Sequence, residues 1–572
     1  MDQADKVDPN EAAELFIWAL TRPDDEDKKQ QLVAAFEKDP RTVLDAVDAV
    51  ANRLDLYPPH FDFQARADAV ETWKNCIGEQ SCLPLGYRRS TSLKGLVGVI
   101  AEARDKKVAV RAIGSGHSFS DITNSQGALL VDPSSGLNQV FPVDPSILHD
   151  GSDPANMIRA QCGITVADLN KALDAKKLGL INMGAYDGQT ISGALSTGTH
   201  GSGAKYGPMA DFLLSIVLVT ESGKVYQIEP SPSSTPQQPI TDPAKFPGHL
   251  PEAPDVPVEL KQDDEWFRAA KVAMGCLGII YSYTIRVQEA FSVSEVRSMT
   301  TWEAMKPLLS SSSWPPPILQ DIDHFELLIN PYAEDNASHK CIKVERTRKK
   351  LQKPSGERLS GFWSWMEKLS VKNSWALVTA LNKVPGLLNR SAINTALGFL
   401  VDMAPPYVDV SHAVFTLGVE NTVSAWAVEL HVDAAEDCVA AIDKVLAAFK
   451  TLGREHKWYI AGPLGIRFIR ASDAFLAPQA GRFTCAVELD MLYGIHHDRE
   501  LLGKVKEIIC STVGGDGNHS VRVHWGLDWG YTTRDDVRRW YPDLGRWQAV
   551  FRELNTTGMF DNAFTKRLGL RE

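Results

Sequence analysis

A short apolar run that ends in a glycine and serine loop is the feature that most constrains the fold of this 572-residue chain. Residues 108–113 (VAVRAI) precede the segment GSGHSFSD at 114–121. This pattern predicts a strand that ends in a turn. Gly114 and Gly116 let the backbone adopt positive φ and approach a ligand, so that successive N–H groups can face a pyrophosphate. The sequence therefore predicts an anion-binding loop that carries His117.

A nicotinamide-dinucleotide fingerprint is the first alternative for this loop. Asp132 ends the next strand-like run, at about the 20-residue spacing that such a fingerprint requires. However, Phe119 occupies the position of the third glycine, and residues 120–123 do not begin a helical pattern. The fingerprint is incomplete, and the alternative stays open at this point.

A second stretch, residues 184–203, is rich in glycine and hydroxyl side chains. This composition predicts a loop that lines a long polar ligand and forms no packed core element. Together, GSGHSFSD and QTISGALSTGTHGSG resemble the flavin-binding domain of the vanillyl-alcohol oxidase superfamily, and especially its sugar-lactone and alditol oxidase branch.

The resemblance implies an FAD cofactor that is bonded covalently through His117. The second stretch has no cysteine where doubly linked relatives carry another attachment, which implies a single bond. His200 has two interpretations, a direct flavin contact or a side chain that fixes the loop. The remaining residues expected to hold the cofactor are Gly114, Ser115, Gly116, Ser118, Gln189, Thr190, Gly193, Ser196, Thr197, Gly201, Gly278 and Ile279.

The resemblance implies an α+β protein with a two-part FAD-binding domain and a substrate-binding cap that contains a large antiparallel sheet. We expect strands in the cap at 324–330, 413–417, 426–430 and 485–489, and an apolar helical region at 361–403 that is a cap helix or a membrane-surface helix. The expected parts are a helical extension (1–70), the FAD domain (71–290) with an exposed proline-rich loop (229–258), the cap (291–520) and a return segment (521–572).

Composition restricts the partners of the chain. Apolar residues make up 44% of it, as in globular proteins, and 72 acidic against 60 basic residues argue against a general binder of nucleic acid or anionic membranes. The eight cysteines show no zinc-site spacing, and we predict no metal. The polar N-terminus lacks a signal pattern, and no run of about 18 apolar residues follows. We therefore expect a cytoplasmic protein without a transmembrane segment.

The catalytic residues are expected in the cap and the return segment. Arg467 matches the arginine of the relatives' substrate strand, and its fixed guanidinium can orient a substrate oxygen. The glutamate that relatives carry two residues earlier is Gly465 here, and the lysine that follows His-Trp-Gly is Leu527. The proton acceptor is therefore expected to be Glu488 or His524, with a slight preference for His524.

These features predict an FAD-dependent oxidoreductase that removes a hydride from a CH–OH group of an alcohol, polyol or sugar lactone. Oxygen or another acceptor would reoxidise the flavin. One alternative keeps the fold but uses a more apolar hydroxylated substrate, such as a sterol, terpenoid or natural-product intermediate. The other is a catalytically inactive flavin-binding protein whose N-terminal helices recruit a partner.

Overall fold

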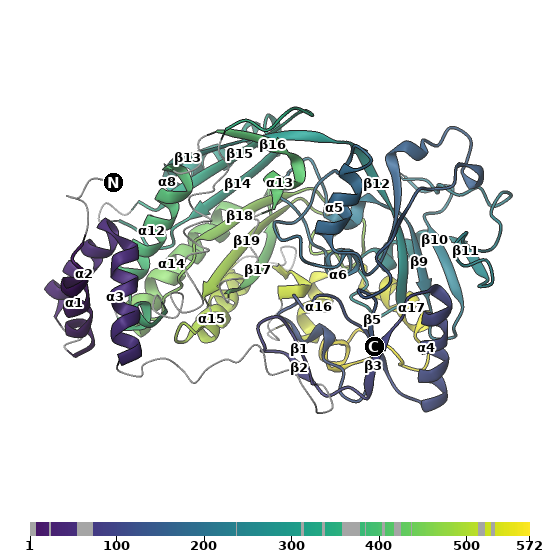
Figure 1. Cartoon of the computed structure of the whole chain (residues 1–572), viewed down its shortest axis with the longest axis horizontal. Helices are drawn as coiled ribbons and strands as arrows, with labels where there is room; N and C mark the ends of the chain where they lie inside the picture. Colours follow the sequence, from purple (N-terminus) through teal and green to yellow (C-terminus); the bar gives the residue numbers. More distant parts are fainter. Residues whose placement is uncertain are drawn as a thin grey trace.

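The computed structural model describes residues 7–21, 25–53, 72–235, 237–310, 314–334, 338–356, 378–383, 385–402, 406–416, 425–435, 438–492, 494–512, 521–527 and 532–572. Its helices and two large sheets confirm the predicted α+β class. Figure 1 shows the N-terminal helices at one end, an eight-stranded sheet in the middle and the α/β units at the other end.

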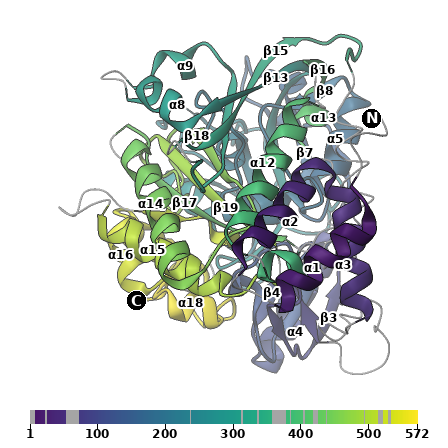
Figure 2. The same ribbon diagram turned by 90° about the vertical axis from the view of Figure 1, so that its left-hand side faces the viewer.

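The N-terminal extension consists of three helices, α1 (Pro9–Thr21), α2 (Glu26–Lys38) and α3 (Pro40–Arg53). The Asp25 side chain caps α2 by accepting a hydrogen bond from the backbone N–H of Lys28. Figure 2 shows these helices beside α12 (Leu387–Asp402), and Ser391 of α12 donates a hydrogen bond of 2.7 Å to Glu37. The extension thus packs on the rest of its own chain.

The first α/β unit is a parallel sheet of β3 (Gly86–Arg89), β5 (Leu129–Asp132) and β4 (Val110–Ala112), in that order. Helix α4 (Leu93–Lys106) joins β3 to β4, and its apolar residues at helical spacing are buried. A short antiparallel pair, β1 (Trp73–Lys74) and β2 (Ser81–Cys82), precedes this unit. The loop after β4 carries the predicted His117 site.

The second unit contains a seven-stranded sheet in the order β11-β10-β9-β12-β7-β6, with β8 also paired to β12. Helix α6 (Ile191–Thr197) lies in the glycine-rich stretch, and α5 (Val166–Asp174) and α7 (Asp264–Lys271) complete the unit. The strands are β6 (Val140–Phe141), β7 (Met157–Gln161), β8 (Leu178–Leu180), β9 (Leu213–Val219), β10 (Val225–Glu229), β11 (Val258–Gln262) and β12 (Ile279–Glu289).

The proline-rich loop between β10 and β11 is only partly exposed. Its described residues form isolated bridges but no helix or strand before Val258, as predicted. The buried Glu229 carboxylate accepts hydrogen bonds from the backbone N–H groups of Ile240 and Thr241 and from the Thr241 hydroxyl. The centre of the loop is therefore fixed to the sheet, and the loop predicted to be exposed is buried in part.

The cap sheet is the eight-stranded sheet, in the order β16-β13-β15-β14-β18-β19-β17-β20, and all its paired strands are antiparallel. Its strands are β13 (Phe291–Thr301), β14 (His324–Ile329), β15 (Lys340–Lys350), β16 (Tyr407–Val410), β17 (Ala425–Asp433), β18 (Leu464–Ile469), β19 (Thr484–Leu492) and β20 (Arg522–Val523). The other cap helices are α8 (Trp302–Leu309), α9 (Pro317–Gln320), α14 (Cys438–His456) and α15 (Asp498–Thr512).

One predicted cap strand is wrong. Residues 411–415 form the helix α13 (Ser411–Phe415), not a strand, and Phe415 packs against Phe291 and His324. A short apolar run has no period that distinguishes a strand from one buried helical turn. Of the apolar helical region predicted at 361–403, residues 387–402 form α12, and residues 361–377 lie outside the described residues.

The C-terminal segment returns to the first unit. After β20 it forms the short 3-10 helix η6 (Trp525–Leu527), then α16 (Arg534–Trp540), α17 (Leu544–Leu554) and α18 (Ala563–Arg567). The Val110 backbone N–H donates to the Met559 carbonyl at 2.8 Å, and Figure 1 shows these helices beside β3 and β5. The exact domain boundaries stay a prediction.

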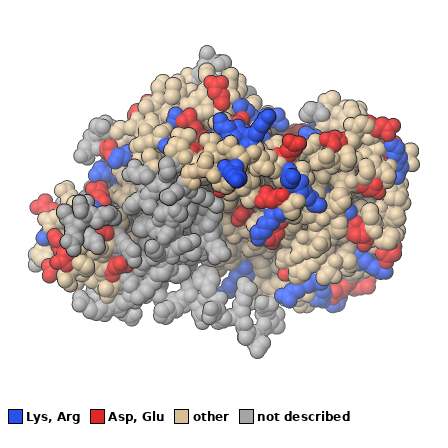
Figure 3. All heavy atoms as spheres, turned by 45° about the horizontal axis from the view of Figure 1, so that its top comes forward, with Lys and Arg blue, Asp and Glu red and all other residues tan. Residues whose placement is uncertain are grey.

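On the face that Figure 3 shows, acidic and basic side chains lie interspersed. The absence of a nucleic-acid partner stays a prediction. None of the helices among the described residues is long and apolar enough to cross a membrane. The cytoplasmic location also stays a prediction.

Candidate active site

The His117 loop is fixed at both ends. Gly116 has a φ of +69°, a conformation that favours glycine, and its carbonyl accepts a hydrogen bond from the Cys76 N–H at 2.8 Å. The Asn75 side chain donates to the Ser118 carbonyl at 3.0 Å. The His117 ring stacks on Tyr186, with 4.0 Å between ring centroids. Burial lowers the pKa of His117 to about 4, so its imidazole is neutral at physiological pH.

Part of the second glycine-rich stretch is a buried helix, so the prediction that it forms no packed element is wrong for Ile191–Thr197. Thr190 caps α6, Gly198 ends it at a φ of +83°, and Ile191, Ala194 and Leu195 are buried. Four features of its sequence agree with a helix, namely the cap, the apolar spacing, the length and the terminal glycine. The high glycine content of the whole stretch led to the prediction of a loop in spite of these features.

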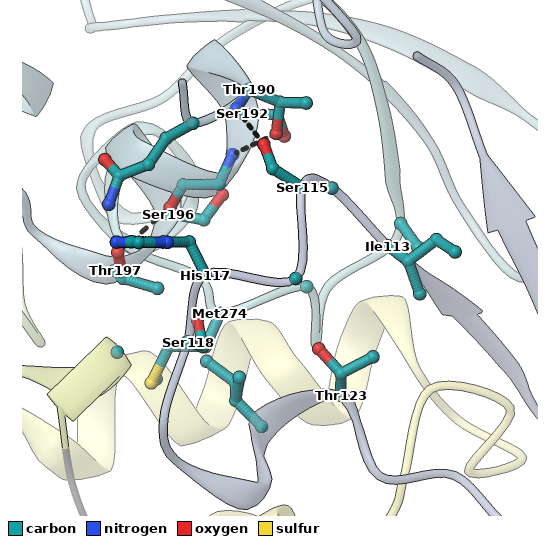
Figure 4. Close-up of a pocket in the computed structure, with 18 of the residues that line it drawn as sticks. Ile113, Ser115, His117, Ser118, Thr123, Thr190, Ser192, Ser196, Thr197 and Met274 are labelled. Carbon is teal, nitrogen blue, oxygen red and sulfur yellow. Dashed lines mark hydrogen bonds between the residues drawn. The ribbon is translucent and has the colours of Figure 1, made fainter. Parts of the chain in front are cut away.

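Two hydrogen bonds of one side chain join the His117 loop to this stretch. Ser115 Oγ donates to the Gly188 carbonyl at 2.7 Å and accepts from the Thr190 N–H at 3.0 Å. A Cβ atom at Gly114 would lie 2.4 Å from Thr190 Oγ1. Figure 4 shows Ser115 and His117 projecting from one loop toward the segment that carries Thr190, Ser196 and Thr197. The loops approach each other so closely only because position 114 lacks a side chain.

A pocket opens between the two loops. His117, His524 and ten of the thirteen other lining residues below were predicted. The pocket lacks three predicted cofactor residues, His200, Gly201 and Gly278. Its lining includes Gly114, Ser115, Gly116, Ser118, Gln189, Thr190, Gly193, Ser196, Thr197, Met274, Gly275, Ile279 and Gly526.

Two of the three residues outside the pocket have packing reasons to be glycine. A Cβ atom at Gly201 would lie 2.1 Å from Asn182 Oδ1. At Gly278 it would lie 2.5 Å from the Val219 carbonyl oxygen of β9. Both glycines therefore allow close packing behind the pocket.

Arg111 supports the pocket and was not predicted. Its buried guanidinium donates hydrogen bonds to the carbonyls of Met274 (2.5 Å) and Gly275 (3.2 Å), and both of these residues line the pocket. A charged residue in the otherwise apolar run 108–113 was the available signal. The remaining lining is mostly backbone, hydroxyl and apolar, and the buried Gln189 Oε1 has no hydrogen-bond partner. An uncharged polar cradle with a free acceptor fits a dinucleotide such as FAD.

The return segment closes the pocket beside His117. The Phe119 N–H donates to the Gly526 carbonyl at 2.7 Å, and Ser120 Oγ donates to the Trp525 carbonyl at 2.8 Å. His524 Nδ1 accepts a hydrogen bond from the Gly526 N–H at 3.2 Å, so the neutral ring carries its proton on Nε2. Burial lowers the pKa of His524 to about 3. This geometry makes His524 a hydrogen-bond donor and a poor base.

A row of ion pairs crosses the cap sheet and ends beside His524. We call it the charged row, and it consists of Arg297, Glu295, Arg346, Glu326, Arg467, Glu488 and Glu429. Successive N–O distances along it are 2.7 Å (Arg297–Glu295), 2.6 Å (Glu295–Arg346), 3.2 Å (Arg346–Glu326), 2.9 Å (Glu326–Arg467), 2.5 Å (Arg467–Glu488) and 3.6 Å (Arg467–Glu429).

Arg467 thus contacts three carboxylates from three neighbouring strands. Burial acts to lower the pKa of its guanidinium, but these carboxylates raise it well above its usual value. Burial raises the pKa of the Glu488 carboxyl, while Arg467 opposes that change. Arg467 therefore remains a cation, and Glu488 is the weaker acid of the pair.

Glu488 occupies the space beside the position where relatives carry a glutamate. Gly465 on β18 and Glu488 on β19 are register partners. A Cβ atom at position 465 would lie 3.4 Å from Glu488 Oε2. The neighbouring strand therefore supplies a carboxylate that position 465 lacks. Leu527, which replaces the relatives' lysine, lines the pocket.

His200 lies with Glu429 and His431 in a buried group that we call the His–Glu–His cluster. Glu429 Oε1 lies 3.2 Å from His200 Nε2, and Glu429 Oε2 lies 3.4 Å from His431 Nε2. The His524 ring lies 6.3 Å from the His200 ring and 6.4 Å from the His431 ring, measured between centroids. Because His524 lines the pocket, the cluster stands directly behind the pocket wall.

Two family models match most of the chain. An FAD binding domain matches residues 84–229, and a D-arabinono-1,4-lactone oxidase domain matches residues 284–568. These matches favour a flavin over the nicotinamide alternative for the His117 loop.

Proteins similar in sequence include the L-gulono-1,4-lactone dehydrogenase of Mycobacterium tuberculosis (strain ATCC 25618 / H37Rv), which is 26% identical over 87% of this chain and 98% of its own length. The L-gulonolactone oxidase of Bos taurus is 26% identical over 87% of this chain and 97% of its own length. A solvent-stable cholesterol oxidase has a similar fold, with a TM-score of 0.62 at 17% identity over 87% of this chain and 97% of its own.

Proposed function

Because the chain belongs to the sugar-lactone oxidase branch of the vanillyl-alcohol oxidase superfamily and is an FAD-dependent oxidoreductase, we propose that its substrate is a sugar-1,4-lactone. The observation that carries this proposal is the charged row beside His524. A polyhydroxylated lactone can exchange hydrogen bonds with guanidinium and carboxylate groups, whereas a sterol would exclude water from them and offer few hydrogen bonds in return. The resemblance to cholesterol oxidases concerns the fold alone.

We propose that FAD occupies the pocket and is bonded to His117. The neutral imidazole of His117 supports this assignment, since a nitrogen with a free electron pair can form the bond. Denatured wild-type protein should retain its flavin after acid precipitation, and His117→Ala should release it. Release of all flavin from the denatured wild type would overturn the covalent bond but not FAD binding.

We propose that Arg467 orients the substrate hydroxyl and that Glu488 accepts its proton. Bound FAD would supply the acceptor for the hydrogen on carbon and its electron pair, while Glu488 would take the hydroxyl proton as the carbon–oxygen double bond forms. The raised pKa of Glu488 suits a general base better than the strongly lowered pKa of His524. His524 would donate its Nε2 hydrogen toward the cofactor or substrate.

Anaerobic reduction of the flavin tests the substrate class directly. L-gulono-1,4-lactone, D-arabinono-1,4-lactone, a linear polyol, a long-chain alcohol and a sterol would each be mixed with the flavin-loaded protein. We expect lactones to bleach the flavin absorbance with saturable rates, and the sterol to have no effect. Bleaching by the sterol or alcohol alone would overturn the proposal, and bleaching by no compound would favour a flavin-binding protein without this activity.

We propose oxygen as the electron acceptor. Flavin that has been reduced by substrate should regain its absorbance when it is mixed with air-saturated buffer, at a rate at least equal to turnover. Reoxidation much slower than reduction would identify a dehydrogenase that requires another acceptor.

A further inference from the structure

The His–Glu–His cluster contains polar atoms that lack suitable partners. His200, Glu429 and His431 are at most 4% exposed. Although their charged atoms are close together, His200 Nε2, His431 Nε2 and Glu429 Oε1 make no hydrogen bond. Buried polar groups normally have a partner, so three such atoms at one point require an explanation.

The hydrogen bonds on the far side of each ring define where the electron pairs point. His200 Nδ1 lies 2.8 Å from the Gly201 carbonyl oxygen, which can only accept, so Nδ1 carries the proton. In the neutral ring the free electron pair of Nε2 then faces the Glu429 carboxylate. These two atoms are 3.2 Å apart, and either a hydrogen on Nε2 or a cation between them makes the contact attractive.

His431 gives the same result. Its Nδ1 lies 3.5 Å from Gln479 Nε2, while the buried Gln479 Oε1 has no partner. If the nitrogen and oxygen of the Gln479 amide are exchanged, Oε1 lies against His431 Nδ1 and accepts a hydrogen bond from it. His431 Nε2 would then also direct an electron pair at Glu429.

The charged row leaves an excess of negative charge around the cluster. Its four glutamates face three arginines, which leaves one carboxylate in excess. A bound cation would offset this excess. Arg467, the nearest cation to Glu429, is also paired with Glu326 and Glu488, which reduces its repulsion of such an ion.

We propose that His200, Glu429 and His431 bind a divalent metal ion of the zinc class. Two imidazole nitrogens and one carboxylate oxygen are a ligand set that zinc uses in open sites, with the fourth position free for water or substrate oxygen. Ligand atoms at 2.0–2.2 Å from a tetrahedral ion are about 3.4 Å apart. In the protein, His200 Nε2 lies 3.2 Å from one Glu429 oxygen and His431 Nε2 lies 3.4 Å from the other, and one ligand atom from each residue lies within 4.8 Å of the other two.

The Gly201 carbonyl and Gln479 would act as the outer partners that orient the two histidines. The site lies behind His524, beside the pocket wall, so the ion would be near the substrate oxygens. It would supply a positive charge that the relatives obtain from the lysine replaced by Leu527. This second role depends on the proposed function, whereas the binding of the metal does not.

Cobalt binding to the full-length, flavin-loaded protein tests the site without any substrate. The protein would be treated with a chelator, dialysed and titrated with Co²⁺ alone. We expect one Co²⁺ per flavin and the intense ligand-field bands of a tetrahedral ion, at wavelengths longer than the flavin absorbance. Zinc should displace the cobalt and abolish the bands. Absence of tetrahedral bands in the wild type would overturn the proposal, and that measurement requires no variant.

Variants then test the ligands. Glu429→Gln and His431→Asn should lose the bands and lower cobalt affinity by about 10- to 100-fold or more. His412→Ala is the matched control because His412 of α13 pairs with Asp174 of α5 and is not part of the cluster. It should retain stoichiometric cobalt with unchanged bands. Equal bands in Glu429→Gln and wild type, with flavin content showing that both are folded, would overturn the assignment.

Discussion

The flavin pocket and the charged row are neighbours that are built in opposite ways. The pocket consists of two loops whose backbone, hydroxyl groups and glycines come from short continuous segments. The charged row consists of long ionised side chains from six strands, which only the strand register brings together. The pocket should therefore be sensitive to added atoms, and the charged row to removed charges. The following substitutions test this difference.

The largest expected effect is from an added side chain in the pocket. Gly114→Val should lose most of its flavin, because a Cβ atom there would lie 2.4 Å from Thr190 Oγ1 and separate the two loops. Flavin content per chain is measured from absorbance after purification. Gly98→Val is the control, since no atom lies within 4 Å of a Cβ there. Full flavin occupancy in Gly114→Val would show that the loops can separate without losing the cofactor.

Loss of the proposed base should slow chemistry without loss of flavin. Glu488→Gln should reduce the rate of anaerobic flavin reduction by about 10²–10⁴-fold, the usual contribution of a general base. His524→Ala should cost less than about tenfold, because its Nδ1 is already occupied and its pKa is strongly lowered. Stopped-flow bleaching with saturating lactone measures both. The reverse order of effects would make His524 the base.

Removal of the central cation tests both chemistry and stability. Arg467→Ala should slow flavin reduction by about 10²–10³-fold, as for the loss of an oxyanion donor. It should also lower the free energy of unfolding by about 3–5 kcal/mol, because Glu326, Glu429 and Glu488 lose their shared partner. Thermal unfolding followed by circular dichroism measures the second effect. Arg467→Lys should recover part of the stability but less of the rate. If Arg467→Ala unfolds at the same temperature as the wild type, the three carboxylates do not need this arginine for the fold to be stable.

The same contrast explains what the sequence could predict. The His117 loop and the Thr190 segment were found because their residues are consecutive, and a turn motif identifies itself locally. The sequence could not show that Glu488 lies opposite Gly465, which has no side chain, because this depends on the register of β18 and β19. Glu326 and Glu429 were missed for the same reason. The only local signal was a charged residue inside a strand pattern, as in FELLI and AVELHV.

Errors in the fold had local causes as well. The strand predicted at 413–417 is the helix α13, and the buried helix α6 was hidden by the glycine content around it. His200 was left with two interpretations because its partners, Glu429 and His431, lie more than two hundred residues away in sequence. Long-range assembly, not residue type, decided its surroundings.

The smallest expected effect concerns the surplus carboxylate of the cap. Asp490 faces Glu488, Glu326, Glu429 and Arg467, and burial followed by these carboxylates raises its pKa well above the usual value. Between the unfolded pKa of about 3.9 and the raised folded pKa, the folded state binds more protons than the unfolded state, so stability falls as pH rises through that window. Asp490→Asn removes the ionisation and should stabilise the protein by about 1 kcal/mol or more at pH 8 and by less at pH 5.

Thermal unfolding of the metal-free protein at both pH values measures this difference. Asp255→Asn is the control, because Asp255 is an exposed residue whose pKa is lowered by Lys94, and its neutralisation should give no stabilisation at either pH. The contrast between the two aspartates follows from their surroundings, since one carboxylate lies among like charges and the other beside a cation. Equal destabilisation of Asp490→Asn at both pH values would show that the cap requires this carboxylate to be charged, and that the charged row carries no negative excess.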